Sequence, residues 1–193
     1  MPCSPITGLI IAGGLARRMG GIDKGLQHWH ARPLLAHVIE RFAPQVGPLW
    51  LNVNHHAENH ASFGLPMIAD IFPGYAGPLA GLHAGLTLCT TPLLACTPCD
   101  TPLLPPDLVE RLHTALETGH ADIAVATAAG RSHPAFLLCR RDVLPNLENF
   151  LAQGGRRIGA WQDTANVTFV DFADEHAFAN INTLEELNSL ETP

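Results

Sequence analysis

Short apolar runs alternate with longer stretches of mixed polarity along the chain. The first run, residues 6–12, is rich in β-branched side chains and is followed directly by Gly13 and Gly14. A continuous apolar run that ends at paired glycines is typical of a buried parallel strand followed by a tight turn. On this pattern we predict strands at residues 6–12, 49–53, 66–69, 93–97, 123–127, 135–138 and 167–172.

The stretches between these runs carry apolar residues at helical spacing. Two of them have a proline near the first turn, Pro78 and Pro105, where the missing N–H of proline costs nothing. Near the end of the chain, Thr183 and Glu186 have the spacing of a capping box. We predict helices at residues 34–42, 78–88, 105–117, 143–151 and 183–190.

The alternation of strands and helices predicts an α/β fold with three α/β/α layers, a mostly parallel sheet and right-handed crossovers. Proline and glycine are spread along the chain, and the sequence contains no repeat or linker, so we interpret residues 1–193 as one domain. Ligands of such domains bind at the carboxyl ends of the strands. The residues that follow the strands are therefore the candidates for a functional site.

Composition narrows the class of protein. With 193 residues, 47% of them hydrophobic and 15% charged, the chain is long and apolar enough to bury a core. The formal net charge of −7, from 11 basic and 18 acidic residues, argues against nucleic acid as a partner and favours a small molecule. Five irregularly spaced cysteines predict free thiols in a reducing compartment. The run at residues 6–12 is too short for a membrane span and lacks the flanks of a secretory signal, so we expect a cytoplasmic protein with no membrane partner.

The first candidate site is the glycine-rich segment at residues 11–24. It holds four glycines, two arginines (Arg17 and Arg18) and Lys24, which is the only lysine of the chain. Glycines let backbone N–H groups converge on an anion without obstruction by Cβ, and the cations compensate its charge, so the segment suits a polyphosphate. It contains neither the Gly-Lys-Ser/Thr of a P-loop nor the Gly-x-Gly-x-x-Gly of a dinucleotide site. A plain surface turn is the alternative.

The second candidate is Asp100, in the segment Thr-Pro-Cys-Asp-Thr-Pro at residues 97–102. A carboxylate at the end of a buried strand can bind Mg²⁺ while the metal bridges substrate phosphates. The alternative is an Asx-turn or a helix cap ahead of Pro105. Cys96 and Cys99 form one C-x-x-C pair without a second, and the eleven histidines show no closed four-ligand spacing, so we expect no zinc site.

The third candidate is the segment at residues 70–82, where glycines stand before and inside the first turn of a predicted helix. A helix entered through glycine allows the backbone to approach a flat or anionic ligand closely, which suits the wall of a nucleoside site. Close packing of the helix on the sheet is the alternative reading. The sequence contains no Gly-x-Ser-x-Gly elbow, so a serine hydrolase lacks support.

Four blocks of the chain together resemble the MobA family of molybdenum cofactor guanylyltransferases, which are nucleotidyltransferases with a Rossmann-like, GT-A-like fold. The blocks are Ile-Ala-Gly-Gly with the following Arg-Met-Gly-Gly and Asp-Lys-Gly-Leu at residues 11–26, Pro-Gly-Tyr-Ala-Gly-Pro-Leu-Ala-Gly at 73–81, Pro-Cys-Asp-Thr-Pro at 98–102 and Asn-Ile-Asn-Thr at 180–183. Their order and spacing agree over nearly the whole chain. The resemblance implies transfer of GMP from GTP to the terminal phosphate of molybdenum-bound molybdopterin, with pyrophosphate as the second product.

The resemblance also implies roles for individual residues. The expected catalytic residues are Lys24, Asp100 and Arg18, with Asp100 also the ligand of Mg²⁺ or, because oxygen ligands accept either ion, Mn²⁺. The expected GTP-binding residues are Ile11, Ala12, Gly13, Gly14, Lys24, Asn52, Asp70, Gly77, Gly81 and Asp100. The expected residues on the molybdopterin side are Arg156, Asn180 and Asn182. Residues 1–105 would then form mainly the GTP-binding part and residues 106–193 mainly the molybdopterin part.

Two other functions stay open at this point. The chain could be another nucleotidyltransferase, acting with CTP on molybdopterin or with a nucleoside triphosphate on a sugar phosphate, or it could be a non-catalytic carrier of nucleotide or pterin. The presence of both Lys24 and Asp100 favours catalysis, since a carrier can bind without stabilising charge at the reacting phosphates. The expected partners are GTP and molybdenum-molybdopterin, together with other proteins of the cofactor pathway and chaperones of molybdoenzymes. We expect a monomer.

Overall fold

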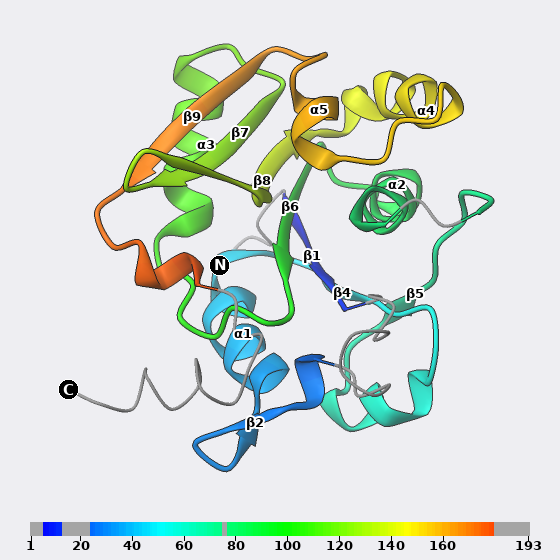
Figure 1. The fold of residues 1–193 in the computed structure, drawn as a ribbon, viewed down its shortest axis with the longest axis vertical. Helices are drawn as coiled ribbons and strands as arrows, with labels where there is room; N and C mark the ends of the chain where they lie inside the picture. The colour runs from blue at the N-terminus through cyan, green and yellow to red at the C-terminus, as the bar shows by residue number, and fades with distance from the viewer. Residues whose placement is uncertain (1–5, 13–23, 75–76, 180–193) are drawn as a thin grey trace.

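The apolar runs come together as one seven-stranded sheet in the computed structural model, which describes residues 6–12, 24–74 and 77–179 (Figure 1). From edge to edge, the strand order is β5-β4-β1-β6-β8-β7-β9. These strands are β1 (Ile6–Ile11), β4 (Leu49–Asn52), β5 (Met67–Ile68), β6 (Leu93–Pro98), β7 (Ile123–Ala128), β8 (Arg131–Arg140) and β9 (Val167–Phe172). The predicted runs thus all became strands of the same sheet.

The sheet is mostly parallel, as predicted. Strand β1 pairs in parallel with both β4 and β6, β4 pairs in parallel with β5, and β7 pairs in parallel with β9. Strand β8 lies antiparallel to β6 on one side and to β7 on the other. The other strands therefore share one direction, and their carboxyl ends meet at one edge of the sheet.

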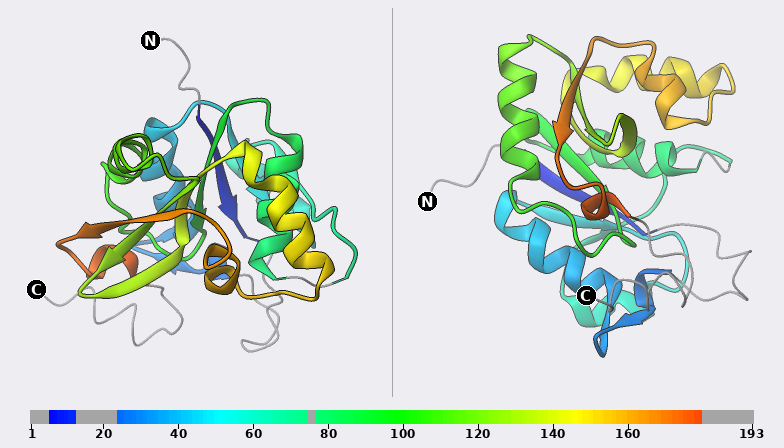
Figure 2. Two further views of the ribbon diagram at one scale, coloured as in Figure 1. Left: turned by 90° about the horizontal axis from the view of Figure 1, so that it is seen from above. Right: turned by 60° about the vertical axis from the view of Figure 1, so that its left-hand side comes forward.

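Helices cover both faces of this sheet. Figure 2 shows helices α1 and α3 on one face and α2 and α4 on the other. The helices are α1 (Leu34–Phe42), α2 (Pro78–Leu88), α3 (Leu108–Thr118), α4 (Leu144–Ala152) and α5 (Ile158–Gln162). Short 3-10 turns connect them: η1 (Lys24–Leu26), η2 (Ala43–Gln45), η3 (Ala57–Phe63), η4 (Arg141–Val143) and η5 (His176–Phe178). The three predicted layers are confirmed.

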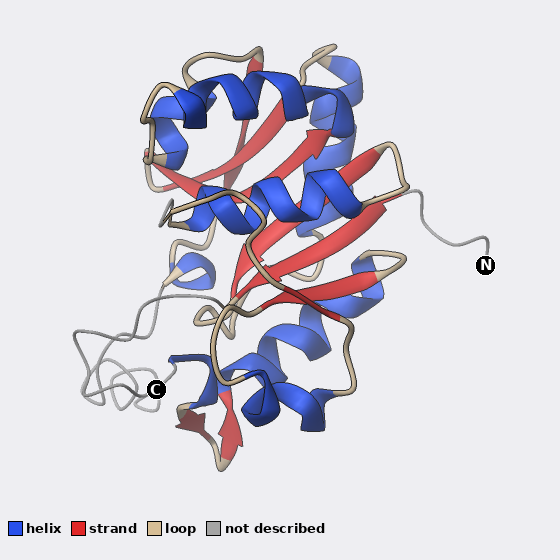
Figure 3. Cartoon of the chain, turned by 90° about the vertical axis from the view of Figure 1, so that its right-hand side faces the viewer, coloured by secondary structure: helices blue, strands red, loops and turns tan. Residues whose placement is uncertain are grey.

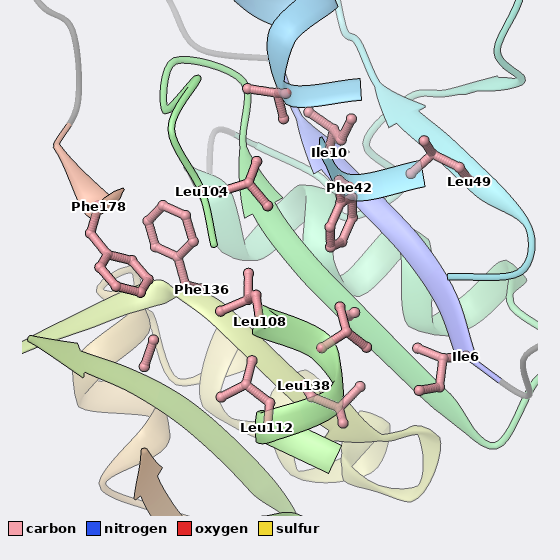
Figure 4. Packing of buried hydrophobic residues seen from close by; sticks show 14 of the residues in the cluster. Ile6, Ile10, Phe42, Leu49, Leu104, Leu108, Leu112, Phe136, Leu138 and Phe178 are labelled. Carbon is pink, nitrogen blue, oxygen red and sulfur yellow. The ribbon is translucent and has the colours of Figure 1, made fainter. Parts of the chain in front are cut away.

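Each face of the sheet has its own hydrophobic core. On the face of α1 and α3, Phe42 and Leu112 pack in one cluster with Ile10 and Leu138 of the sheet (Figure 4). On the opposite face, Trp161 of α5 is fully buried, and its indole Nε1 donates a hydrogen bond of 2.8 Å to Oδ1 of Asn146. Burial of one such side chain stabilises the fold by about 1.5–3 kcal/mol, so the two cores hold the sheet between them.

Some elements differ from the prediction. Helix α3 begins at Leu108 rather than at residue 105, and the predicted helix at 183–190 lies outside the described residues. Helix α5 and a separate hairpin, β2 (His28–Trp29) with β3 (Arg32–Pro33), were not predicted, because segments this short carry no readable period. Figure 3 shows this hairpin apart from the large sheet.

The cysteines among the described residues are free thiols, as predicted. No helix in that part of the chain has the length and hydropathy to cross a membrane.

Candidate active site

Three parallel strands direct their carboxyl ends to the same place. In the register of the sheet, Ile11 at the end of β1 lies opposite Asn52 of β4 and opposite Pro98 of β6. The backbone continues this pairing beyond the strands, because the N–H of Ala12 donates to the carbonyl of Asn52 at 3.0 Å and the N–H of Cys99 donates to the carbonyl of Ile11 at 3.2 Å. The segments that follow β1, β4 and β6 are therefore fixed beside one another.

A network of amides holds Asp70 at the end of β5. The buried side chain of Asn52 donates from Nδ2 to Oδ1 of Asp70 at 3.0 Å and to the carbonyl of Ile68 at 3.3 Å. Asn54 donates from Nδ2 to Oδ2 of Asp70 at 2.9 Å, and its Oδ1 accepts from the backbone N–H of Asp70 at 2.8 Å. Within the described part of the chain, each carboxylate oxygen of Asp70 thus accepts one side-chain hydrogen bond. Because an oxygen of this kind accepts two bonds, capacity remains for donor groups of a ligand.

Two glycines bring the start of α2 against this network. Gly77 precedes the helix with φ 61°, a conformation that residues with a Cβ rarely adopt. Inside the first turns, a Cβ on Gly81 would overlap the side-chain oxygen of Asn52. The amino end of α2 therefore lies close to Asn52, where the helix dipole favours an anionic or polar ligand.

Asp100 and Lys24 form a charged pair on the other side of β1. Oδ2 of Asp100 lies 3.5 Å from Nζ of Lys24, and the side chain of Asp100 is 10% exposed whereas that of Lys24 is 40% exposed. Burial raises the pKa of the Asp100 carboxyl, and the ammonium of Lys24 opposes that shift. Among the described residues Lys24 is the cation beside this largely buried carboxylate, and a further positive charge at this point would stabilise it.

The residues around Asp100 fit a divalent cation of the magnesium type. In the part of the chain that the structure describes, no group of three or more His, Cys, Asp or Glu side chains could hold a metal. Mg²⁺ is usually held by one or two carboxylates, with substrate phosphates and water completing the shell. Asp100 can supply such a carboxylate. The alternative reading of Asp100 as a helix cap is wrong, because Asp107 is the residue that precedes α3.

Arg156 follows α4, on the second half of the chain. Strand β8 runs against its neighbours, and α4 then returns toward the edge where β1 ends (Figure 2, left). The exposed guanidinium of Arg156 donates from Nη1 to the carbonyl of Leu151 at 3.0 Å and to that of Gly155 at 2.7 Å. These bonds hold the guanidinium of Arg156 against the backbone at the end of α4.

The structure groups the expected site residues in two sets. One set comprises Asn52, Asp70, Gly77 and Gly81, and the other comprises Lys24 and Asp100, with Ile11 and Ala12 between them. Gly13, Gly14, Arg18, Asn180 and Asn182 lie outside the described residues. Sequence reasoning placed Asn54 among the residues that follow a strand but gave it no role, whereas the structure shows that it fixes Asp70.

Comparisons with known proteins agree with this fold. Residues 8–166 match the family described as MobA-like NTP transferase domain. The chain is 47% identical over 192 residues to the molybdenum cofactor guanylyltransferase of Cupriavidus necator, covering 97% of this chain and 96% of that protein. It is also 47% identical to the protein of the same name from Bordetella petrii, over 189 residues and 96% of each chain.

Solved structures show the same architecture. The molybdopterin-guanine dinucleotide biosynthesis protein A of Archaeoglobus fulgidus superposes with a TM-score of 0.80 at 24% identity, covering 96% of each chain. A CMP:2-keto-3-deoxy-manno-octonic acid synthetase complexed with CTP superposes with a TM-score of 0.75 at 17% identity, covering 96% of this chain and 98% of that one. At these identities the likeness establishes the fold, which is that of nucleotidyltransferases.

The contact between Gly81 and Asn52 gives a prediction for stability. We expect Gly81→Ala to lower the free energy of unfolding by about 1–3 kcal/mol, because the new methyl group overlaps a buried side chain. Gly159→Ala is the matched control, since a Cβ on Gly159 would meet only Pro134 at 3.8 Å, an ordinary contact. Urea unfolding measures both. If the clash with Asn52 is the cause, adding Asn52→Ala to Gly81→Ala costs less than the sum of the two single changes, and strictly additive costs would contradict it.

Proposed function

The chain belongs to the family of MobA-like NTP transferase domains, and from this premise we propose that it is a molybdenum cofactor guanylyltransferase. It transfers GMP from GTP to molybdenum-bound molybdopterin and forms the guanine dinucleotide cofactor and pyrophosphate. The observation that carries the proposal is the 47% identity, over nearly the full length of both chains, to a relative of that name.

The reaction requires the protein to position the two substrates and to stabilise the charge that develops on them. It does not require a nucleophilic side chain. An oxygen of the acceptor's terminal phosphate attacks the α-phosphorus of GTP, the bond from the α-phosphorus to the bridging oxygen breaks, and the electron pair leaves with pyrophosphate. A phosphate oxygen is already nucleophilic, so the protein accelerates the step by holding both substrates in line and by stabilising the charge that develops.

The two sets of residues have different roles in this reaction, since one set binds the phosphates and the other binds the nucleoside. Lys24 stabilises the phosphates of GTP, with Arg18 as the second expected cation. Ile11 and Ala12 are paired with the neighbouring strands and lead into the turn at Gly13 and Gly14, whose backbone N–H groups donate to the same phosphates. Asp100 would hold Mg²⁺ or Mn²⁺, and such an ion, when bound, would supply positive charge beside the reacting phosphates.

The nucleoside lies over the end of β4 and β5. Asp70 offers acceptor oxygens to nucleoside donors, and Asn52 fixes its orientation. Because Gly77 and Gly81 have no side chains, the first turn of α2 can lie close to Asn52 and form one side of the nucleoside site. This division places the nucleoside and the phosphates on opposite sides of β1.

The acceptor belongs to the second half of the chain. A guanidinium such as that of Arg156 can form two parallel hydrogen bonds to a phosphate, and the amides of Asn180 and Asn182 can donate to and accept from the pterin edge. We further propose a cytoplasmic monomer, which exchanges substrate and product with other proteins of the cofactor pathway and with chaperones of molybdoenzymes.

Release of pyrophosphate tests the function directly. Purified protein with Mg²⁺ is supplied with GTP or CTP, and with molybdenum-loaded molybdopterin or a sugar phosphate. We expect release only with GTP and the pterin together. Release that follows CTP or the sugar phosphate would reassign the substrates, and tight binding of GTP without any release would favour a carrier.

Replacement of the buried carboxylate tests its role. We expect Asp100→Asn to lower kcat at least about a hundredfold, because the amide has nearly the same shape but cannot hold a divalent cation as a carboxylate does. The exposed Asp142 provides the control, since Asp142→Asn makes the same chemical change on η4, away from the site. Mg²⁺-dependent turnover of Asp100→Asn at the wild-type rate would remove Asp100 from the catalytic machinery.

A further inference from the structure

The connection that leads from Asp100 to α3 has few backbone donors of its own. Residues 101–107 read Thr-Pro-Leu-Leu-Pro-Pro-Asp, and the three prolines have no N–H. A long hydrogen bond of 3.4 Å, from the N–H of Leu104 to the carbonyl of Thr101, closes the first turn of this segment. The side chain of Leu104 is fully buried, in the core cluster that contains Phe42 of α1 (Figure 4). Because buried carbonyls need donors, the segment depends on donors from other elements.

Side chains at the end of α1 and on η2 supply these donors. The amide of Gln45 on η2 donates from Nε2 to the carbonyl of Pro105 at 2.9 Å and to that of Arg41 at 2.8 Å. Its Oε1 accepts from the backbone N–H of Val109 at 2.9 Å. Arg41 donates from Nη1 to the carbonyl of Leu104 at 3.3 Å. One amide thus ties α1, the connection and α3 together, and its orientation is fixed, since a flipped amide would turn its oxygen toward two carbonyls.

Gln45 also takes the place of a helix cap. Within the described chain, Asp107 precedes α3 without capping it, and Oδ2 of its side chain instead lies 3.7 Å from Nη1 of Arg111. Val109 is the second residue of α3, and a capping side chain usually satisfies the N–H at this position. Here Gln45 satisfies it, from 64 residues earlier in the chain. The start of α3 and the connection before it are therefore held by the same side chain.

Helix α1 supports the partner of Asp100 as well. Lys24 begins the turn η1, and the next residue, Gly25, is packed between two other segments. A Cβ on Gly25 would lie 3.3 Å from Cβ of Cys99 and 3.5 Å from Cβ of Leu35 in α1. The ion pair of 3.5 Å between Lys24 and Asp100 thus joins two segments that both rest on α1.

We propose that Gln45 is a positioning residue for Asp100: by holding the turn at Pro105 and the start of α3 against the end of α1, it fixes where the Asp100 carboxylate lies. The inference rests on the proposed function, in the part that has Asp100 hold a divalent cation beside the phosphates of GTP. Gln45 acts through the backbone of residues 101–105 and not by contact with a substrate.

Calorimetric titration with GTP, in Mn²⁺ and in EDTA, tests the position of the carboxylate. We expect Mn²⁺ to tighten the binding of GTP to the wild-type protein, and Gln45→Ala to reduce that gain about tenfold, because a carboxylate displaced by about 1 Å no longer meets the ion. In EDTA, the Kd for GTP is expected to change less than about twofold. Asn166→Ala is the control, since it removes an amide that donates to the carbonyl of His120 at 3.0 Å, before the start of β9 at the opposite edge of the sheet.

A second variant separates the tie to the connection from the cap on α3, and it decides the test if Gln45→Ala does not fold. Gln45→Glu keeps an oxygen for the N–H of Val109 but has no donor for the carbonyl of Pro105. Its added negative charge alone would strengthen the binding of a cation. We expect this variant to lose the same part of the Mn²⁺ gain, a result opposite in sign to the effect of charge.

Hydrogen exchange follows the connection itself, without GTP or metal. The N–H groups of Leu104 and Leu108 close its two turns. We expect both amides to exchange faster in Gln45→Ala and in Gln45→Glu, whereas the amide of Val109 exchanges faster in Gln45→Ala alone. All three are expected to keep the wild-type rate in Asn166→Ala.

The outcomes that overturn the proposal differ from those that overturn the function. Equal losses of GTP affinity in Mn²⁺ and in EDTA, an undiminished Mn²⁺ gain in a folded Gln45 variant, or wild-type exchange at Leu104 and Leu108 would overturn it. A wild-type protein whose affinity for GTP does not depend on Mn²⁺ would do the same. If the wild-type protein releases no pyrophosphate with GTP and the pterin, the proposed transfer fails, but the titrations use no acceptor and still decide the inference.

Discussion

The parallel pairing of β1 with β4 on one side and β6 on the other is the constraint on which the site depends. It places Ile11 opposite both Asn52 and Pro98, so that three segments distant in sequence leave the sheet together. Hydrogen bonds from Ala12 and Cys99 extend the pairing past the strands. Any slip in this register would separate the Asn52 network from the pair of Lys24 and Asp100, since side chains alternate between the two faces of a strand.

Several residues at this edge of the sheet are in environments or conformations that lower the stability of the fold. Asp100 is a carboxyl group largely removed from water, and Gly77 holds a backbone conformation that suits only glycine. Glycine has a low helix propensity, but at position 81 it allows α2 to contact Asn52. Two hydrophobic cores, one on each face of the sheet, supply the stability that these arrangements cost. A rigid layered scaffold with unfavourable groups gathered at one edge is the expected form of a binding site that must be preorganised.

Much of this could be read from the sequence, and the failures have physical causes. Apolar runs and helical spacing predicted the strands of the large sheet and α1, α2 and α4, because burial on both faces leaves a strong pattern. The direction of β8 was not predicted, since the pattern of a buried strand is the same either way. Helix α5 and the β2–β3 hairpin were too short to show a period. The family was predicted from its motifs and is confirmed, whereas the individual roles of Lys24, Asp70, Asp100 and the other site residues stay predictions. The support of Asp70 by Asn54 depends on side-chain geometry that no spacing reveals.

The most direct test of the account is a crystal structure of the protein with GTP and Mn²⁺, in which anomalous scattering locates the metal. The account predicts a manganese ion bound directly to the carboxylate of Asp100, at about 2.0–2.3 Å, and to phosphate oxygens of GTP, with Lys24 on the phosphates and the nucleoside over Asp70. A metal and nucleotide bound together away from the carboxyl ends of β1, β4 and β6 would contradict it.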